Sequence, residues 1–125
     1  MLEQPGAKVV LNTLLGSGDP SEWEVALSSE DPDDGWSEIT GGSYERVTIG
    51  NTEDEWSDVS DQEKMNEAAV MFPTATSNWG RIRAIGLYDP STGERKMRGR
   101  VIPPRSVRDG DTPRFAIGTM VIRAR

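Results

Sequence analysis

Clusters of turn-forming residues interrupt the chain at intervals of about ten to twenty residues. Asp31-Pro32-Asp33-Asp34-Gly35 and Asp89-Pro90-Ser91-Thr92-Gly93 have compositions typical of tight turns, and Gly41-Gly42 is a third break. Between the breaks, apolar and polar side chains alternate as they do in half-buried strands. A chain divided in this way favours short strands joined by turns and disfavours long helices.

The alternation predicts six strands, over residues 23–28, 44–49, 68–72, 81–88, 94–102 and 114–123. The turn at residues 89–93 joins the fourth and fifth strands into a hairpin. Residues 52–67 are acidic and poor in aliphatic side chains, so we expect a loop there that carries Trp56 and Val59 inward.

A helical pattern occurs near the N-terminus, at residues 7–15. Val9, Val10, Thr13 and Leu14 share one face of a 3.6-residue period. The 125 residues fit one domain, residues 1–125, because two hydrophobic cores would each be marginal. We therefore predict an antiparallel β-sandwich, jelly-roll-like or immunoglobulin-like, with one short N-terminal helix. A mixed α+β domain with the helix across the sheet is the alternative.

The sequence contains no His and no Cys. This excludes the usual zinc, haem and iron–sulfur ligand sets, thiol nucleophiles, Ser-His-Asp triads and disulfides. Carboxylate pairs such as Glu22/Glu24 could serve a glycosidase, but a chain of this length has little room for both a core and a cleft. We expect a protein without enzymatic activity, with no catalytic residues, no cofactor and no metal.

Asp31, Asp33 and Asp34 form the pattern closest to a calcium loop. Gly35 comes one residue too early for an EF-hand, and the closing Glu is missing, so a solvated turn is favoured. The first thirty residues lack the pattern of a signal peptide, and no stretch of about 18 apolar residues could span a bilayer. We therefore expect a soluble protein that does not contact membranes.

The charges divide along the chain. Residues 1–80 contain 17 acids and three bases, whereas residues 81–125 contain four acids and 11 bases, within a net charge of −7. The two parts could neutralise each other within one monomer or meet between neighbouring copies. Nucleic acid is a disfavoured partner, because no recognisable binding module is present and the acidic part would repel phosphate.

The basic part contains a candidate interface strand. Lys96, Arg98 and Arg100 alternate with smaller or apolar residues, and Pro103-Pro104 predicts that the strand ends at a sheet edge. We expect arginines of this region to meet acids of a neighbouring copy. The candidate residues are Arg98, Arg100 and Arg105 on the basic side and Glu53, Asp54, Glu55 and Asp58 on the acidic side.

The most distinctive stretch is residues 71–80. It reads as the end of a buried strand, a proline stop, a run of small hydroxyl residues, and Trp79 beside Gly80. We expect it to build a corner of the fold and not a ligand pocket.

Several motifs follow one another in a characteristic order. They are Val25-Ala26-Leu27 before Asp31-Pro32, Gly41-Gly42-Ser43-Tyr44-Glu45-Arg46, Phe72-Pro73-Thr74-Ala75-Thr76 with Trp79-Gly80, Ile85-Gly86-Leu87-Tyr88-Asp89, Thr92-Gly93, Pro103-Pro104-Arg105 and Asp109-Gly110-Asp111. In this order, which covers nearly the whole chain, they resemble a family of small tailed-bacteriophage proteins labelled tail-fibre-like or minor structural proteins. The charged segment 94–100 departs from the family's more apolar strand.

The resemblance implies a non-enzymatic structural component of the virion of a tailed phage or tailed archaeal virus. Such a protein is β-rich, assembles in the host cytoplasm as a symmetric oligomer, and has as partners its own copies and a capsid or tail protein. Two alternatives remain open. One is a capsid decoration or cement protein on the head surface, and the other is a carbohydrate-binding adhesin in which Trp36 or Trp56 stacks on sugars.

Overall fold

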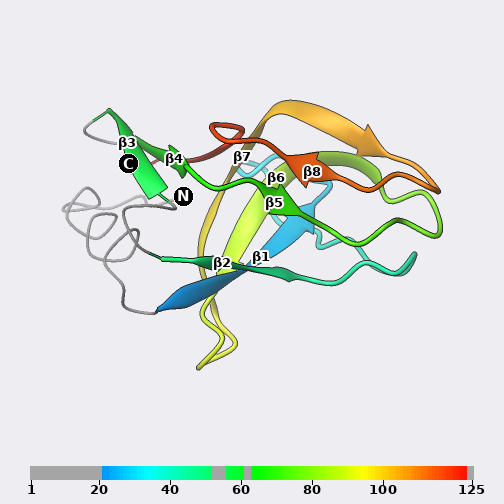
Figure 1. Ribbon diagram of the computed structural model, residues 1–125, viewed down its shortest axis with the longest axis horizontal. Coiled ribbons are helices and arrows are strands. Elements are labelled where there is room, and N and C mark those ends of the chain that lie inside the picture. Colours follow the sequence, from blue (N-terminus) through cyan, green and yellow to red (C-terminus); the bar gives the residue numbers. More distant parts are fainter. Residues whose placement is uncertain (1–20, 52–55, 61–62, 124–125) are drawn as a thin grey trace.

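The computed structural model describes residues 21–51, 56–60 and 63–123, which form the strands shown in Figure 1. The helix predicted at residues 7–15 lies outside these described residues. The strands are β1 (Glu22–Ser28), β2 (Val47–Gly50), β3 (Trp56–Ser60), β4 (Glu63–Asn66), β5 (Val70–Met71), β6 (Gly80–Tyr88), β7 (Arg95–Val107), β8 (Arg114–Phe115) and β9 (Met120–Arg123). Over the part of the chain that the structure describes, no helix is long and apolar enough to cross a bilayer.

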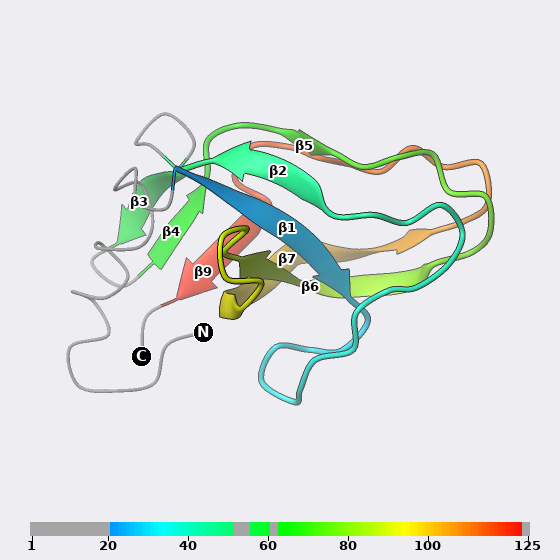
Figure 2. The same cartoon turned by 90° about the horizontal axis from the view of Figure 1, so that it is seen from below.

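Seven of these strands form one antiparallel sheet in the order β2-β1-β6-β7-β9-β4-β3, and β5 pairs with β8 in a small second sheet. The predicted mainly β, antiparallel fold is confirmed. The predicted sandwich is not: the large sheet curls into a half-barrel, with β3, β4 and β9 gathered at one end of the molecule (Figure 2). The β3–β4 hairpin pairs with β9 and so extends the seven-stranded sheet. Because these strands belong to the large sheet, the described residues do not build a second layer of similar size.

The long strand β7 bends within the sheet. Ala84 of β6 faces Arg100, but Ile82, two residues away, faces Arg105, so β7 bulges at Pro103-Pro104. A bulge accommodates prolines, which cannot donate to a ladder, and it increases the local twist. The middle of β7 is not at an edge, because β9 pairs with Arg100 and Val101 on the side away from β6. Past the bulge, residues 105–107 pair with β6 and with no other described strand, so the predicted edge lies at this end of β7.

Two further sequence predictions need correction. Residues 114–123 are not one strand, because a turn closed by the hydrogen bond from the Thr119 N–H to the Ala116 carbonyl separates β8 from β9. Residues 52–67 are not all loop, because they contain the β3–β4 hairpin. Trp56 points inward as predicted, with 1% exposure, and its indole N–H donates to the Gly50 carbonyl at 3.1 Å. That bond links the ends of β2 and β3, the two edge strands of the sheet.

The core fills the concave side of the sheet. Val25 faces Leu87 and Leu27 faces Ile85 across the β1–β6 pair, and all four side chains are fully buried. Such cross-strand apolar pairs are the main source of stability in a sheet of this size.

The stretch 71–80 builds a packed corner, as expected. The backbone N–H of Thr76 and the indole N–H of Trp79 both donate to the Gly42 carbonyl, each at 2.9 Å. The Tyr44 ring packs edge-on to Trp79 at 5.4 Å and stacks on Phe72 at 6.3 Å. Two motifs that are thirty residues apart in the sequence therefore meet in the fold and serve its packing.

Candidate interaction surface

Part of the loop between β1 and β2, residues 29–46, packs on the face of the sheet opposite to the core. Small residues on β1 and β6 allow the loop to approach closely. A Cβ atom added at Gly86 would lie 2.5 Å from the ring of Trp36, so the indole rests directly on the glycine backbone. Two of the seven predicted interface residues, Arg98 and Arg100, lie on β7 beneath this loop.

The basic row of β7 holds the loop in place. Arg100 forms ion pairs with Asp31, at 2.7 Å, and with Asp33, and Arg98 donates to the Gly35 carbonyl at 3.2 Å. Asp31 also accepts the Asp33 backbone N–H, and this bond together with Arg100 lowers the pKa of the Asp31 carboxyl below its usual value. Here, acids from the first part of the sequence and a base from the last part neutralise each other within one chain.

The remaining interface candidates lie elsewhere. Arg105 lies past the bulge of β7, where it donates to the Arg114 carbonyl at 2.6 Å and its guanidinium lies 5.2 Å from the centre of the Phe115 ring. Glu53, Asp54 and Glu55 lie outside the described residues, and Asp58 belongs to β3. A contact of these arginines with acids of a neighbouring copy stays a prediction.

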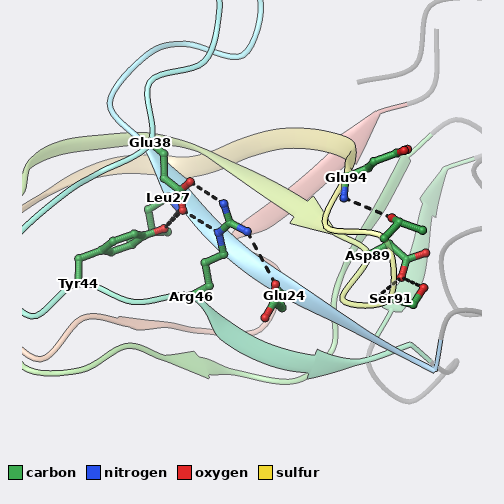
Figure 3. A network of polar contacts seen from close by, with 9 residues as sticks. Glu24, Leu27, Glu38, Tyr44, Arg46, Asp89, Ser91 and Glu94 are labelled. Carbon is green, nitrogen blue, oxygen red and sulfur yellow. Dashed lines mark hydrogen bonds and ion pairs between the residues drawn. The ribbon is translucent and has the colours of Figure 1, made fainter.

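A second polar cluster, centred on Arg46, was not predicted from the sequence (Figure 3). Arg46 donates two hydrogen bonds to Glu38, at 2.9 and 2.8 Å, and lies 3.7 Å from Glu24, while the Tyr44 hydroxyl donates to Glu38 at 2.8 Å. Burial raises the pKa of Glu38, but the bonds from Arg46 and Tyr44 outweigh it and hold the pKa below its ordinary value. One feature of the sequence could have indicated this cluster: Arg46 is one of only three bases in residues 1–80.

Aromatic rings continue this cluster across the sheet. The Arg46 guanidinium lies 3.6 Å above the Tyr88 ring, Tyr88 packs against Trp36 at 6.3 Å, and Arg95 lies 4.9 Å from the centre of the Trp36 ring. Cations above aromatic faces contribute about 0.5–1 kcal/mol each at such partly exposed places. Trp36 is partly exposed whereas Trp56 is buried, so only Trp36 of the two candidate sugar-stacking residues is accessible.

A groove with a volume of about 270 Å³ lies beside the bulge of β7. Val101, Ile102 and Pro103 of β7 form one wall, and Phe115 and Ala116 form the other. Arg105 and Arg114 border it, and no acidic residue occurs among the described residues that line it. The groove therefore combines an apolar floor with a positive rim.

We predict that Arg46→Gln lowers the free energy of unfolding by about 1–2 kcal/mol at pH 7, because charge-assisted hydrogen bonds to a partly buried carboxylate are lost. The contribution of a carboxyl with a lowered pKa is present above its unfolded value, 4.5, and is lost as the pH falls through its folded pKa. The difference from wild type should therefore shrink below pH 4.5 in urea titrations. Lys96→Gln, which breaks the exposed ion pair with Glu94, is the control and should cause no measurable change. An equally large loss in both variants, or one independent of pH, would contradict this assignment.

Comparison with known protein families identifies a match. The protein-family model described as Podophage GP4 fiber I protein gp80 matches residues 6–123, nearly the whole chain and all of the strands described above. No curated protein matches the chain significantly. The resemblance read from the order of the motifs agrees with this match.

Proposed function

The chain belongs to the family of the podophage GP4 fiber I protein gp80, and from this premise we propose that it is a subunit of a phage tail fibre that assembles with its own copies into a symmetric oligomer. The family is one of phage fibre proteins, so the chain is a structural component of the virion. The proposed partners are other copies of the chain and a neighbouring tail protein, with assembly in the host cytoplasm before the particle is released.

The match over residues 6–123 carries this proposal. The contacts on the convex face also support a structural role. Arg100 with Asp31 holds the β1–β2 loop against β7, and Arg46 links Glu38 of the loop to Glu24 of β1. The ring of Trp36 lies on Gly86. These polar groups are used to fix the surface of a rigid β domain.

Purified virions provide the test. We expect quantitative mass spectrometry to find the chain in multiple copies per particle, and antibodies against it to label the tail fibres in electron micrographs. Label over the head would favour the alternative of a capsid decoration protein. Absence of the chain from purified particles would contradict the proposal.

The adhesin alternative now depends on Trp36. If the chain is a structural subunit, a glycan array should show no binding that depends on this residue. Binding by wild type that Trp36→Ala abolishes and Trp36→Phe retains would favour the adhesin, because a stacking platform needs an aromatic ring. Both variants must first show wild-type circular dichroism, since Trp36 covers Gly86.

A further inference from the structure

Large apolar side chains are exposed in and next to the small β5–β8 sheet and at the groove beside it. Among the described residues the exposed ones are Met71 (57%), Ile102 (51%) and Ile117 (55%). Met71 faces Arg114 across the β5–β8 pair, and Ile117 follows Ala116, which lines the same groove as Ile102. The two short strands lie side by side in Figure 1. We call this surface, made of Met71, Ile102, Ile117, Arg105 and Arg114, the β8 face.

The β8 face has the chemistry of a docking surface. Isolated apolar side chains on a surface are ordinary, but a cluster around a groove marks an interaction site. Its two charged members are both arginines, a residue type enriched at the centre of protein interfaces. A partner surface that covers this face must therefore supply apolar contact area together with negative charge.

A second copy of the chain has the required charge. The chain carries a net charge of −7, and residues 1–80 contain 17 acids against three bases. Exposed acids among the described residues include Glu22, Glu30, Asp34 and Glu45, all outside the β8 face. A second copy therefore carries exposed carboxylates that can complement the arginines of the β8 face.

The charges also decide the geometry of the contact. In a two-fold contact the same surface would face itself, so Arg105 and Arg114 of one copy would oppose those of the other. Like charges brought together in this way are unfavourable. A head-to-tail contact, in which the β8 face meets a different and acidic surface, avoids this repulsion and closes into a ring when the rotation permits.

We propose that the β8 face is the surface by which one copy docks head-to-tail on exposed acidic residues of the next copy in the oligomer. This inference rests on the proposed function and adds to it the surface, the residues and the kind of symmetry. Ile102 and Ile117 supply the apolar burial, and Arg105 and Arg114 set the partner and the orientation.

The experiment compares the full-length wild type with two variants by sedimentation velocity over a range of concentration. The variants are Ile117→Lys and the double variant Arg105→Glu/Arg114→Glu. Each should raise the dissociation constant of the oligomer by about tenfold or more, because either apolar burial or charge complementarity is lost. Wild-type affinity should fall as salt rises. Arg81→Glu is the matched control, because Arg81 is exposed and its neighbour Ile82 points into the core, so it should leave assembly unchanged.

A single cysteine distinguishes the two symmetries, since the natural chain has none. Under mild oxidation Ile117→Cys should not form a disulfide-linked dimer within the oligomer, because a head-to-tail contact keeps the two copies of residue 117 apart. Rapid formation of that dimer would show a two-fold contact and overturn the proposal. Folded variants with wild-type assembly would overturn it while leaving the fibre assignment intact. A wild-type chain that stays monomeric at all concentrations, yet is found in fibres, would also overturn it.

Discussion

Asn66→Ala should lower the free energy of unfolding by about 3–5 kcal/mol, a larger effect than most single substitutions have. The Asn66 side chain is completely buried. Its amide N–H₂ donates to the carbonyls of Ala68 and Ala116, at 3.0 and 3.1 Å, and its oxygen accepts the backbone N–H groups of Gly118 and Met120, at 3.1 and 3.0 Å. Alanine removes all four bonds: the Ala68 carbonyl and the buried Met120 N–H lose the partner that the side chain supplies, whereas the Ala116 carbonyl keeps Thr119 and the Gly118 N–H keeps the Asn66 carbonyl. The loss frees the turn that directs the chain from β8 into β9.

Chemical denaturation of Asn66→Ala and Asn66→Asp would measure this effect. The aspartate keeps the size of the side chain but presents a carboxylate to two carbonyls, so burial should raise its pKa. A raised pKa means that the carboxylic acid form fits the folded state better, so Asn66→Asp should be less destabilising at pH 4 than at pH 7. Asn78→Ala is the control, because the exposed Asn78 accepts one hydrogen bond, from Asp109, and its loss should cost about 1 kcal/mol or less. A small effect of Asn66→Ala would show that water replaces the amide.

Gly99→Ala should be the second most disruptive change, costing about 3 kcal/mol, because two strands must separate. Gly99 lies on the concave side of β7, and a Cβ atom there would overlap the backbone carbonyl oxygen of Val121 and the side chain of Ile122. The neighbouring carbonyl belongs to β9 and cannot rotate away as a side chain could. We expect a thermal transition lowered by several degrees and weaker amide protection in β9.

Gly93→Ala is the matched control for Gly99→Ala. Gly93 has a φ of 74°, but nothing lies within 4 Å of the position of its Cβ. Backbone strain alone should cost about 1–2 kcal/mol there. If Gly99→Ala costs no more than Gly93→Ala, β7 and β9 are less tightly packed than the structure indicates.

Local patterns predicted the strands whose alternation follows the usual rule. In β1 and in the β6–β7 hairpin, apolar side chains face the core, and the turn at residues 89–93 has strong turn chemistry. The strand β4 reverses the rule, because its buried positions are Lys64 and Asn66. An acidic segment with polar residues inside reads as a loop, and only its pairing with β3 and β9 makes it a strand.

Pairing between distant segments also explains which surface contacts could not be predicted from the sequence. The alternation of Lys96, Arg98 and Arg100 correctly placed these bases on one face of a strand. It could not show that Asp31 and Asp33, almost seventy residues earlier, reach Arg100, or that β9 pairs with the middle of β7. The apolar groove likewise depends on the bulge in β7 and on the turn between β8 and β9. This turn was missed because the sequence pattern predicts a single strand over residues 114–123.

The most direct test is a cryo-electron microscopy reconstruction of the tail fibre on intact particles. We expect the domain of strands β1 to β9 to be found in the fibre in copies related by rotational symmetry. Ile102 and Ile117 should be buried at each contact, and Arg105 and Arg114 should face carboxylates of the next copy. A fibre that lacks this domain, or one in which the β8 face is open to solvent in every copy, would contradict the account.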